Sequence, residues 1–150
     1  MTYTTLISSD TLSQHLNDNN WIIIDCRFSL ADSEAGEKAY RMGHIANARY
    51  AHLDKDLSSR ITSTTGRHPL PDFNLLINKL GQWGINNKSQ VVVYDDANGA
   101  FASRLWWLLH CLGHDQVAVL DGGLAHWKKL NKPLTTTLPS INVKTFRAYG

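Results

Sequence analysis

Cysteine is scarce in this sequence, since only Cys26 and Cys111 occur among its 150 residues. Two cysteines do not make a disulfide framework, and a chain of this length can bury well over half of its unfolded surface in one core without disulfides. Cys26 follows a β-branched run and Cys111 lies within a helical pattern, so we expect both as free thiols in apolar surroundings. Free thiols are typical of a reducing compartment, and we expect a cytoplasmic protein.

Charge of one sign and long apolar runs are also lacking. Lys and Arg total 15 against 13 for Asp and Glu, with a net charge of +2 and no basic stripe. Charge this small and this dispersed does not indicate a nucleic-acid partner. The residues from Met1 to Thr5 lack the regions of a signal peptide, and no apolar run approaches a membrane span. The sequence therefore predicts neither a nucleic-acid nor a membrane partner.

Short β-branched runs alternate with apolar residues at helical spacing. We expect strands at 6–7, 21–25, 48–51, 91–94 and 117–120. The helical patterns predict helices at about 10–17 with Ser9 as its cap, at 73–83, at 101–112, and from Gly122-Gly123 through Trp127. This alternation predicts an α/β fold with a parallel sheet of about five strands, right-handed crossovers and helices on both faces.

The segment 131–150 differs in kind from the rest of the chain. It contains Pro133, a run of three threonines and Leu138-Pro139, with no helical or strand period long enough to pack. We therefore predict one domain over residues 1–130. The segment 131–150 is predicted to be a linker toward a second domain that this chain does not contain.

Asp95 directly follows the buried run 91–94, where parallel strands present ligands and reactive groups beyond their carboxyl ends. A carboxylate there is a poor nucleophile toward sulfur, and Asp96 beside it adds to the repulsion of anions. We hypothesise that Asp95 accepts hydrogen bonds from the loop's backbone N–H groups, in the place of an anion. Arg104, on the next predicted helix, is expected to form a structural ion pair with Asp25, Asp95 or Asp96 rather than to bind substrate.

Cys26 is the alternative nucleophile, because Arg27 beside it could lower the pKa of the thiol. No helix N-terminus is predicted behind it, so a buried structural thiol is preferred, and Cys111 is expected to fill the core. His110, Cys111 and His114 invite a zinc site. A glycine breaks the helix before His114 and no further pair completes four ligands, so no metal is expected. The sequence implies no cofactor.

Several short motifs, in their order and spacing, resemble the rhodanese family. The likeness is to the N-terminal, non-catalytic domain of two-domain thiosulfate and 3-mercaptopyruvate sulfurtransferases, and it extends from about Leu6 to near Phe146. It implies an α/β rhodanese-like fold. The motifs are Tyr94-Asp95, Arg104-Leu105-Trp106-Trp107, Gly113-His114, Leu120-Asp121-Gly122-Gly123 and Trp127, supported by Ile24-Asp25, Gly43-His44-Ile45 and His68-Pro69-Leu70-Pro71.

The resemblance implies how such a chain would work. In that family a persulfide forms on a loop cysteine of the C-terminal domain, and its sulfur passes to an acceptor such as cyanide or a protein thiol. The resemblance puts Asp95 at the position of that cysteine, so no catalytic residue and no activity are expected in this chain alone. It also implies that His44 faces the active loop of the partner domain, with Asp32 or Glu34 orienting it. A structural histidine that fixes the turn before Ile45 is the alternative.

The implied partners are a second rhodanese domain of the same enzyme and a small sulfur donor at the interface between the domains. That donor is thiosulfate or 3-mercaptopyruvate, and the sequence does not choose between them. Two other functions stay open. One is a stand-alone, inactive rhodanese-homology module that binds a protein partner, and the other is a small thiol enzyme or sulfur carrier that uses Cys26.

Overall fold

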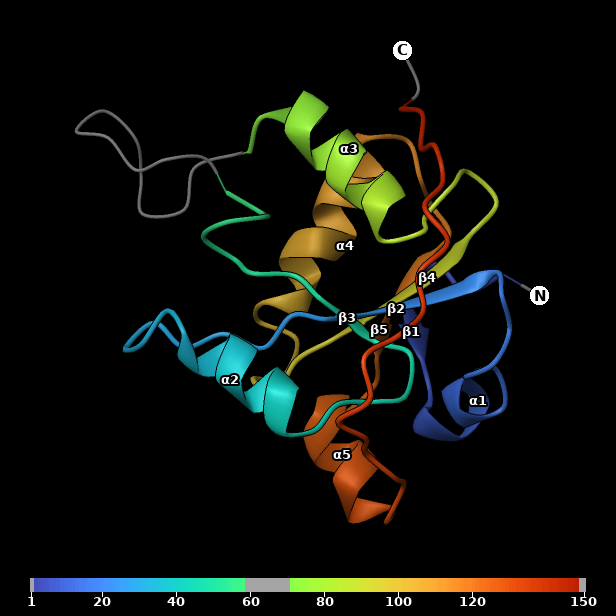
Figure 1. Cartoon of the computed structure of the whole chain (residues 1–150). Helices are drawn as coiled ribbons and strands as arrows, with labels where there is room; N and C mark the ends of the chain where they lie inside the picture. The colour runs from blue at the N-terminus through green and yellow to red at the C-terminus, as the bar shows by residue number, and fades with distance from the viewer. Residues whose placement is uncertain (1, 59–70, 149–150) are drawn as a thin grey trace.

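The computed structural model describes residues 2–58 and 71–148, so the first three residues of the motif at 68–71 lie outside the described residues. Five strands alternate with five helices along these ranges (Figure 1). The strands are β1 (Leu6–Ile7), β2 (Trp21–Asp25), β3 (Arg49–Tyr50), β4 (Gln90–Tyr94) and β5 (Val117–Leu120). The helices are α1 (Ser9–Ser13), α2 (Ala35–Met42), α3 (Phe73–Gln82), α4 (Ala102–Cys111) and α5 (Gly123–Lys129).

The strands form one parallel sheet in the order β1-β5-β4-β2-β3. The register aligns Ile23 of β2 with Val92 of β4, and Val92 with Ala118 of β5. β2 and β4 lie in the middle and every residue of both is buried, as continuous β-branched runs predict for a sheet covered on both sides. The predicted parallel α/β sheet of five strands is confirmed.

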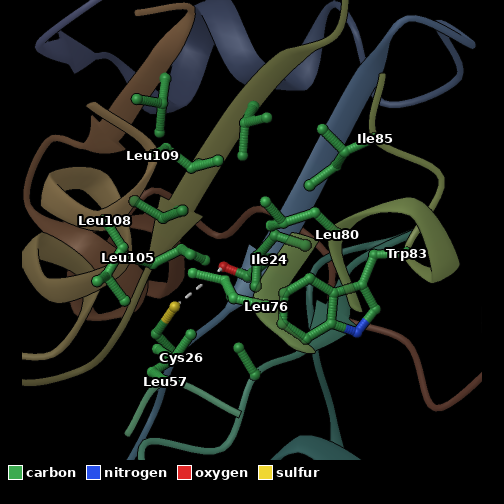
Figure 2. Packing of buried hydrophobic residues seen from close by; sticks show 14 of the residues in the cluster. Ile24, Cys26, Leu57, Leu76, Leu80, Trp83, Ile85, Leu105, Leu108 and Leu109 are labelled. Carbon is green, nitrogen blue, oxygen red and sulfur yellow. Dashed lines mark hydrogen bonds between the residues drawn. The ribbon is translucent and has the colours of Figure 1, made fainter. Parts of the chain in front are cut away.

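Alternate residues of the central strands pack into two separate hydrophobic clusters, one on each face of the sheet. Helices α3 and α4 cover one face and α1, α2 and α5 the other (Figure 1). Figure 2 shows the first cluster, where Ile24 of β2 lies among leucines from both covering helices. The helices on both faces are therefore also as predicted. The labelled members from the helices are Leu76, Leu80, Leu105, Leu108 and Leu109.

Helix α1 is displaced from its predicted position. Its cap is Ser8, not Ser9, because Ser8 has an extended backbone and its Oγ accepts a hydrogen bond from the Thr11 N–H at 3.1 Å. The helix ends at Ser13 and does not reach Asn17. Helix α2 was not predicted at all, since only Gly36 and Tyr40 of its eight residues are buried and the sequence shows no apolar stripe.

The segment 131–148, here called the strap, does not extend away from the body. It runs back from α5 across the molecule toward the end of α3 (Figure 1). Thr135 and His44 exchange two backbone hydrogen bonds of 2.8 and 2.9 Å, and the Lys144 N–H donates to the Gly81 carbonyl at 2.9 Å. Phe146 is 3% exposed and belongs to the cluster of Figure 2. The expectation that nothing in this segment packs is wrong, because single side chains and backbone pairs anchor it without any period.

Truncating Phe146 tests whether the strap is part of the folded unit. Phe146→Ala is expected to lower the free energy of unfolding by about 3 kcal/mol, since a buried ring is lost and the site is left underpacked. Urea denaturation followed by tryptophan fluorescence measures this. Leu138→Ala is the matched control, because Leu138 lies on the same strap and is 66% exposed. Equal stability of the two variants would show that the strap does not stabilise the domain.

Candidate functional site

Asp95 lies at the carboxyl end of β4, and its carboxylate is enclosed by backbone donors. The side chain is only 1% exposed. Its Oδ1 accepts hydrogen bonds from the N–H groups of Ala97 and Gly99, both at 2.9 Å. Its Oδ2 accepts from Phe101 and Ala102, both at 2.8 Å. The N–H groups of the loop thus converge on one anionic group, which is the arrangement hypothesised from the sequence.

The loop owes this shape to residues with positive φ and to support from α5. Asn98 and Gly99 have φ of 58° and 87°, a conformation that turns neighbouring N–H groups toward one side. The Asp95 carbonyl in turn accepts a hydrogen bond of 2.9 Å from the Leu124 N–H, in the first turn of α5. Gly123 lies against that carbonyl, and a Cβ there would come within 2.7 Å of the oxygen. The start of α5 therefore fixes the base of the loop.

Arg104 does not form the ion pair expected from the sequence. Its Nε and one Nη donate to the Leu57 carbonyl at 3.2 and 3.1 Å, and the same Nη lies 3.4 Å from Ser58 Oγ. Within the described ranges no salt bridge joins it to Asp25, Asp95 or Asp96. The oxygens of Asp95 are already taken by N–H groups, and Asp25 has a nearer arginine. Arg104 instead holds the segment after β3 against α4.

A buried network at the ends of β2 and β4 escaped the sequence analysis. Asp25 is 0% and Arg27 is 4% exposed, and Arg27 Nη2 lies 2.7 Å from Asp25 Oδ2 while Nε lies 3.0 Å from the same oxygen. The Tyr94 hydroxyl donates to that carboxylate at 2.8 Å and accepts from the Ile45 N–H at 3.2 Å. Burial raises the pKa of Asp25, although Arg27 and Tyr94 oppose the rise. Two charged residues that flank Cys26 at a strand end were the available signal.

The network also positions His44, because the backbone N–H of the next residue, Ile45, donates a hydrogen bond to the Tyr94 hydroxyl. His44 is fully buried, its Nδ1 lies 2.9 Å from the Ile45 carbonyl, and its ring stacks on Tyr40 with centroids 4.2 Å apart. Nδ1 therefore has the proton, since a carbonyl can only accept. Nε2 has no hydrogen-bond partner among the described residues. Glu34 does not orient this ring as expected, because its carboxylate lies beside a different histidine.

That histidine is His52, which the sequence analysis also missed. It is 3% exposed, and its Nδ1 accepts hydrogen bonds from the backbone N–H groups of Asp54 and Lys55 at 3.1 and 3.2 Å. The ring proton is thus on Nε2, which lies 3.7 Å from a carboxylate oxygen of Glu34. Phe28 contacts the His52 ring edge-on and also contacts a ring of the Asp95 loop. His52 followed the short predicted strand at 48–51, but no sequence pattern distinguished it.

Cys26 is poorly placed for nucleophilic chemistry. It is 1% exposed and lies at the edge of the apolar cluster near Leu57 (Figure 2). Burial raises the pKa of its thiol well above the usual value, and the nearby carboxylates, first Asp25, raise it further. Arg27 was expected to lower that pKa, but its guanidinium is bound to Asp25 instead. The thiolate is therefore disfavoured at neutral pH.

Cys111, His110 and His114, which invite a zinc site, have different surroundings in the structure. Cys111 is exposed, contrary to the expected core position, because the inner face of α4 is filled by its leucines. His110 lies 3.1 Å from a carboxylate oxygen of Asp115, and His114 Nε2 lies 2.9 Å from the Ser89 carbonyl. Among residues 2–58 and 71–148, no three His, Cys, Asp or Glu side chains are grouped to hold a metal ion.

None of the helices in these ranges is long and apolar enough to cross a membrane.

The sequence and the fold were compared with known proteins. The Rhodanese-like domain family matches residues 8–130. A probable 3-mercaptopyruvate sulfurtransferase of Pseudomonas aeruginosa is 45% identical over 144 residues, which cover 95% of this chain and 51% of that protein. The 3-mercaptopyruvate sulfurtransferase of Escherichia coli strain K12 is 33% identical over 131 residues, which cover 86% of this chain and 46% of that protein.

Solved structures give the same picture. The 3-mercaptopyruvate sulfurtransferase from Leishmania major superposes with a TM-score of 0.83 at 29% identity, over 97% of this chain and 40% of that chain. The Escherichia coli enzyme SseA, described as a 3-mercaptopyruvate sulfotransferase, gives 0.82 at 28% identity, over 98% of this chain and 57% of that chain. The chain spans about half the length of the curated relatives named here. By family match, identity and fold, the chain belongs to the rhodanese family.

Proposed function

We propose that this chain is the non-catalytic, N-terminal half of a two-domain sulfurtransferase. The whole enzyme moves sulfane sulfur from thiosulfate or 3-mercaptopyruvate to a thiophilic acceptor such as cyanide. Support comes from relatives that are named for one or both of these donors. The chain spans 51% and 46% of the two 3-mercaptopyruvate sulfurtransferases compared above. A reducing, cytoplasmic location suits the two free cysteines of the chain.

The enclosed carboxylate of Asp95 is the observation on which this proposal rests. A cysteine that forms a persulfide needs a stabilised thiolate, and converging N–H groups beyond a strand end can supply that. In this chain four such groups bind the Asp95 carboxylate, which cannot form a persulfide. Cys26 is buried with a raised pKa, and Cys111 lies on the outer side of α4, so neither thiol takes over the role.

In the proposed enzyme the second domain supplies the cysteine and most of the cations that bind the donor. This half contributes one wall of the cleft. Asp96 is exposed at the rim of the Asp95 loop, and Arg104 orders the segment after β3 on the same side. His44 lies against Tyr40 of α2, on the other face of the sheet from α4, and is joined to the end of β4 through Ile45 and Tyr94. Because its Nε2 has no hydrogen-bond partner in the part of the chain that the structure describes, His44 is the candidate for proton transfer with the partner domain.

A second candidate is an inactive module that binds a protein partner. Trp107 favours it, because this large aromatic ring on α4 is 46% exposed. Such a ring serves equally well as a contact with the second sulfurtransferase domain. The variant Trp107→Ala distinguishes these two functions. Under our proposal, it loses affinity for the C-terminal domain of its own enzyme.

Thiocyanate formation from cyanide tests the proposal directly. With thiosulfate and then 3-mercaptopyruvate as donor, we expect the 150-residue chain to give no thiocyanate above the rate without protein. Cys26→Ser and Cys111→Ser should behave identically, and an active rhodanese run in parallel verifies the assay. Turnover that disappears in Cys26→Ser would overturn the proposal and make the chain a thiol enzyme by itself.

A further inference from the structure

A polar cavity is lined by Trp21 and Ile22 at the amino end of β2, whereas the Asp25 network lies at the carboxyl end of the same strand. Its volume is about 290 Å³, near the lower end for small-molecule sites. The turn after α1, the first residues of β2 and the strap form its walls. Asp95 and its loop follow the carboxyl end of β4, so this cavity is separate from the sulfur-transfer site proposed above. The side chains used below are Asn17, Asn47, Arg49, Ser140, Asn142 and Lys144.

Arg49 of β3 is a buried cation for which residues 2–58 and 71–148 provide no carboxylate partner. Its side chain lies in the cavity wall and the residue is 7% exposed. One Nη donates to the Asn47 carbonyl at 2.7 Å, but Nε is buried without a hydrogen-bond partner among the described residues. Within those residues no salt bridge includes Arg49. Arg27, which lies just after the neighbouring strand β2, is similarly buried, yet its Nε and Nη2 donate to the Asp25 carboxylate.

A buried guanidinium without an opposite charge is costly, and its fork of donors suits a carboxylate or a phosphate group. A second cation, Lys144, lines the same cavity from the strap. The one carboxylate in the lining is Asp18, whose Oδ2 lies 3.7 Å from His15 Nδ1. Two cations against one carboxylate leave the cavity positive. An anion in the cavity therefore gains Coulomb attraction from both cations, and Arg49 has no carboxylate among the described residues to compete with it.

The rest of the lining suits a polar ligand and is held in place. The amides of Asn17, Asn47 and Asn142 and the hydroxyl of Ser140 can donate and accept hydrogen bonds. The wall formed by the strap is anchored by the backbone bond from Lys144 to Gly81 and by Phe146 in the core. The site is thus formed before a ligand arrives, which reduces the entropy lost on binding.

We propose that this cavity binds a small, polar metabolite through an oxyanion group, with that group on the guanidinium of Arg49 and the ammonium of Lys144. The ligand's polar body then lies against the asparagine amides. A carboxylate and a phosphate share this chemistry, and the volume restricts the ligand to a small molecule. The site acts independently of sulfur transfer, so it stands whether or not the chain is half of a sulfurtransferase.

Titration of the ¹⁵N-labelled 150-residue chain with sodium phosphate and, separately, sodium succinate tests this at constant ionic strength. With at least one of the two probes we expect saturable shifts of the amide signals around Asn17, Asn47 and 140–144. The probe that saturates identifies the group as phosphate or carboxylate. No saturable shift with either probe, or shifts spread over all surface lysines in proportion to concentration, would overturn the proposal.

Variants then assign the binding to Arg49. Arg49→Gln is expected to weaken binding by roughly tenfold, as loss of a charge-assisted hydrogen bond implies. Arg41→Gln is the matched control, because Arg41 is 71% exposed and pairs with Glu37 on α2. Since a change at buried Arg49 can disturb folding, Lys144→Gln on the strap gives a second reading, with binding about threefold weaker. Undiminished binding in a folded Arg49→Gln, or in Lys144→Gln, would contradict the assignment.

Discussion

Asp95→Ala is expected to lower the free energy of unfolding by about 3 kcal/mol, because four N–H groups lose a charged acceptor and most of them stay away from water. At roughly 3 °C per kcal/mol for a chain of this size, the melting temperature should fall by about 9 °C. Urea denaturation and a thermal scan measure the two quantities. Asp95→Asn should lie between the wild type and the alanine variant, since its amide keeps one acceptor oxygen.

Asp96→Ala is the control for this change. Asp96 is the adjacent carboxylate and is exposed, so its removal should leave stability unchanged. If Asp95→Ala melted with the wild type, the carboxylate would not be holding the loop. The loop would then also be free to accept an external anion, and the main support for a silent domain would be lost.

Arg27→Met is expected to cost about 4 kcal/mol at about pH 7, because it leaves the carboxylate of Asp25 buried without its cation. The loss should depend on pH. Burial already raises the pKa of Asp25 against the opposing effect of Arg27, so the variant raises it further. The folded variant then binds a proton at pH values where the unfolded chain does not. Its free energy of unfolding should therefore increase as the pH falls from about 7 toward the usual carboxyl pKa.

Denaturation curves at several pH values measure this, and the difference between wild type and variant should narrow in acid. Arg41→Met removes an exposed arginine and should show neither the loss nor the pH dependence. Adding Asp25→Asn to Arg27→Met should restore part of the stability, since no buried charge then remains. A constant difference at every pH would mean that lost packing, not the unpaired carboxylate, causes the effect.

The strands were predictable because their signal is local. A continuous β-branched run such as Ile22–Ile24 is typical of a parallel strand that is buried on both faces of its sheet. The alternation of such runs with apolar residues at helical spacing then predicted the class of fold. Helix α2 gives no such signal. Its contacts with the body are made by Gly36, where a Cβ would collide with the Arg27 carbonyl, and by the ring of Tyr40. Neither a glycine nor a single tyrosine in a sequence indicates a buried helix face.

Of the candidate site, the sequence predicted the position of Asp95 and its surroundings, but not the partners of the arginines. The position of Asp95 after a buried strand was enough to infer that N–H groups would surround it. The partner of each arginine could not be predicted, because three carboxylates and several carbonyls compete for the guanidinium groups at the strand ends. Arg27 binds Asp25 two residues away, Arg104 binds the carbonyl of Leu57, and Arg49 has no carboxylate partner among the residues that the structure describes. Only the folded arrangement decides among such partners.

The strap also has a consequence for the order of events during synthesis. Asn87 and Arg147 are sixty residues apart and exchange two hydrogen bonds, of 2.6 and 2.9 Å. A nascent chain that has emerged as far as α5 has every strand of the sheet but still lacks the ring of Phe146. Contacts so distant in sequence close late and slow the final step of folding. We therefore expect the core around Phe146 to stay incompletely covered during synthesis until the strap has left the ribosome, and chaperones and proteases can reach it in that interval.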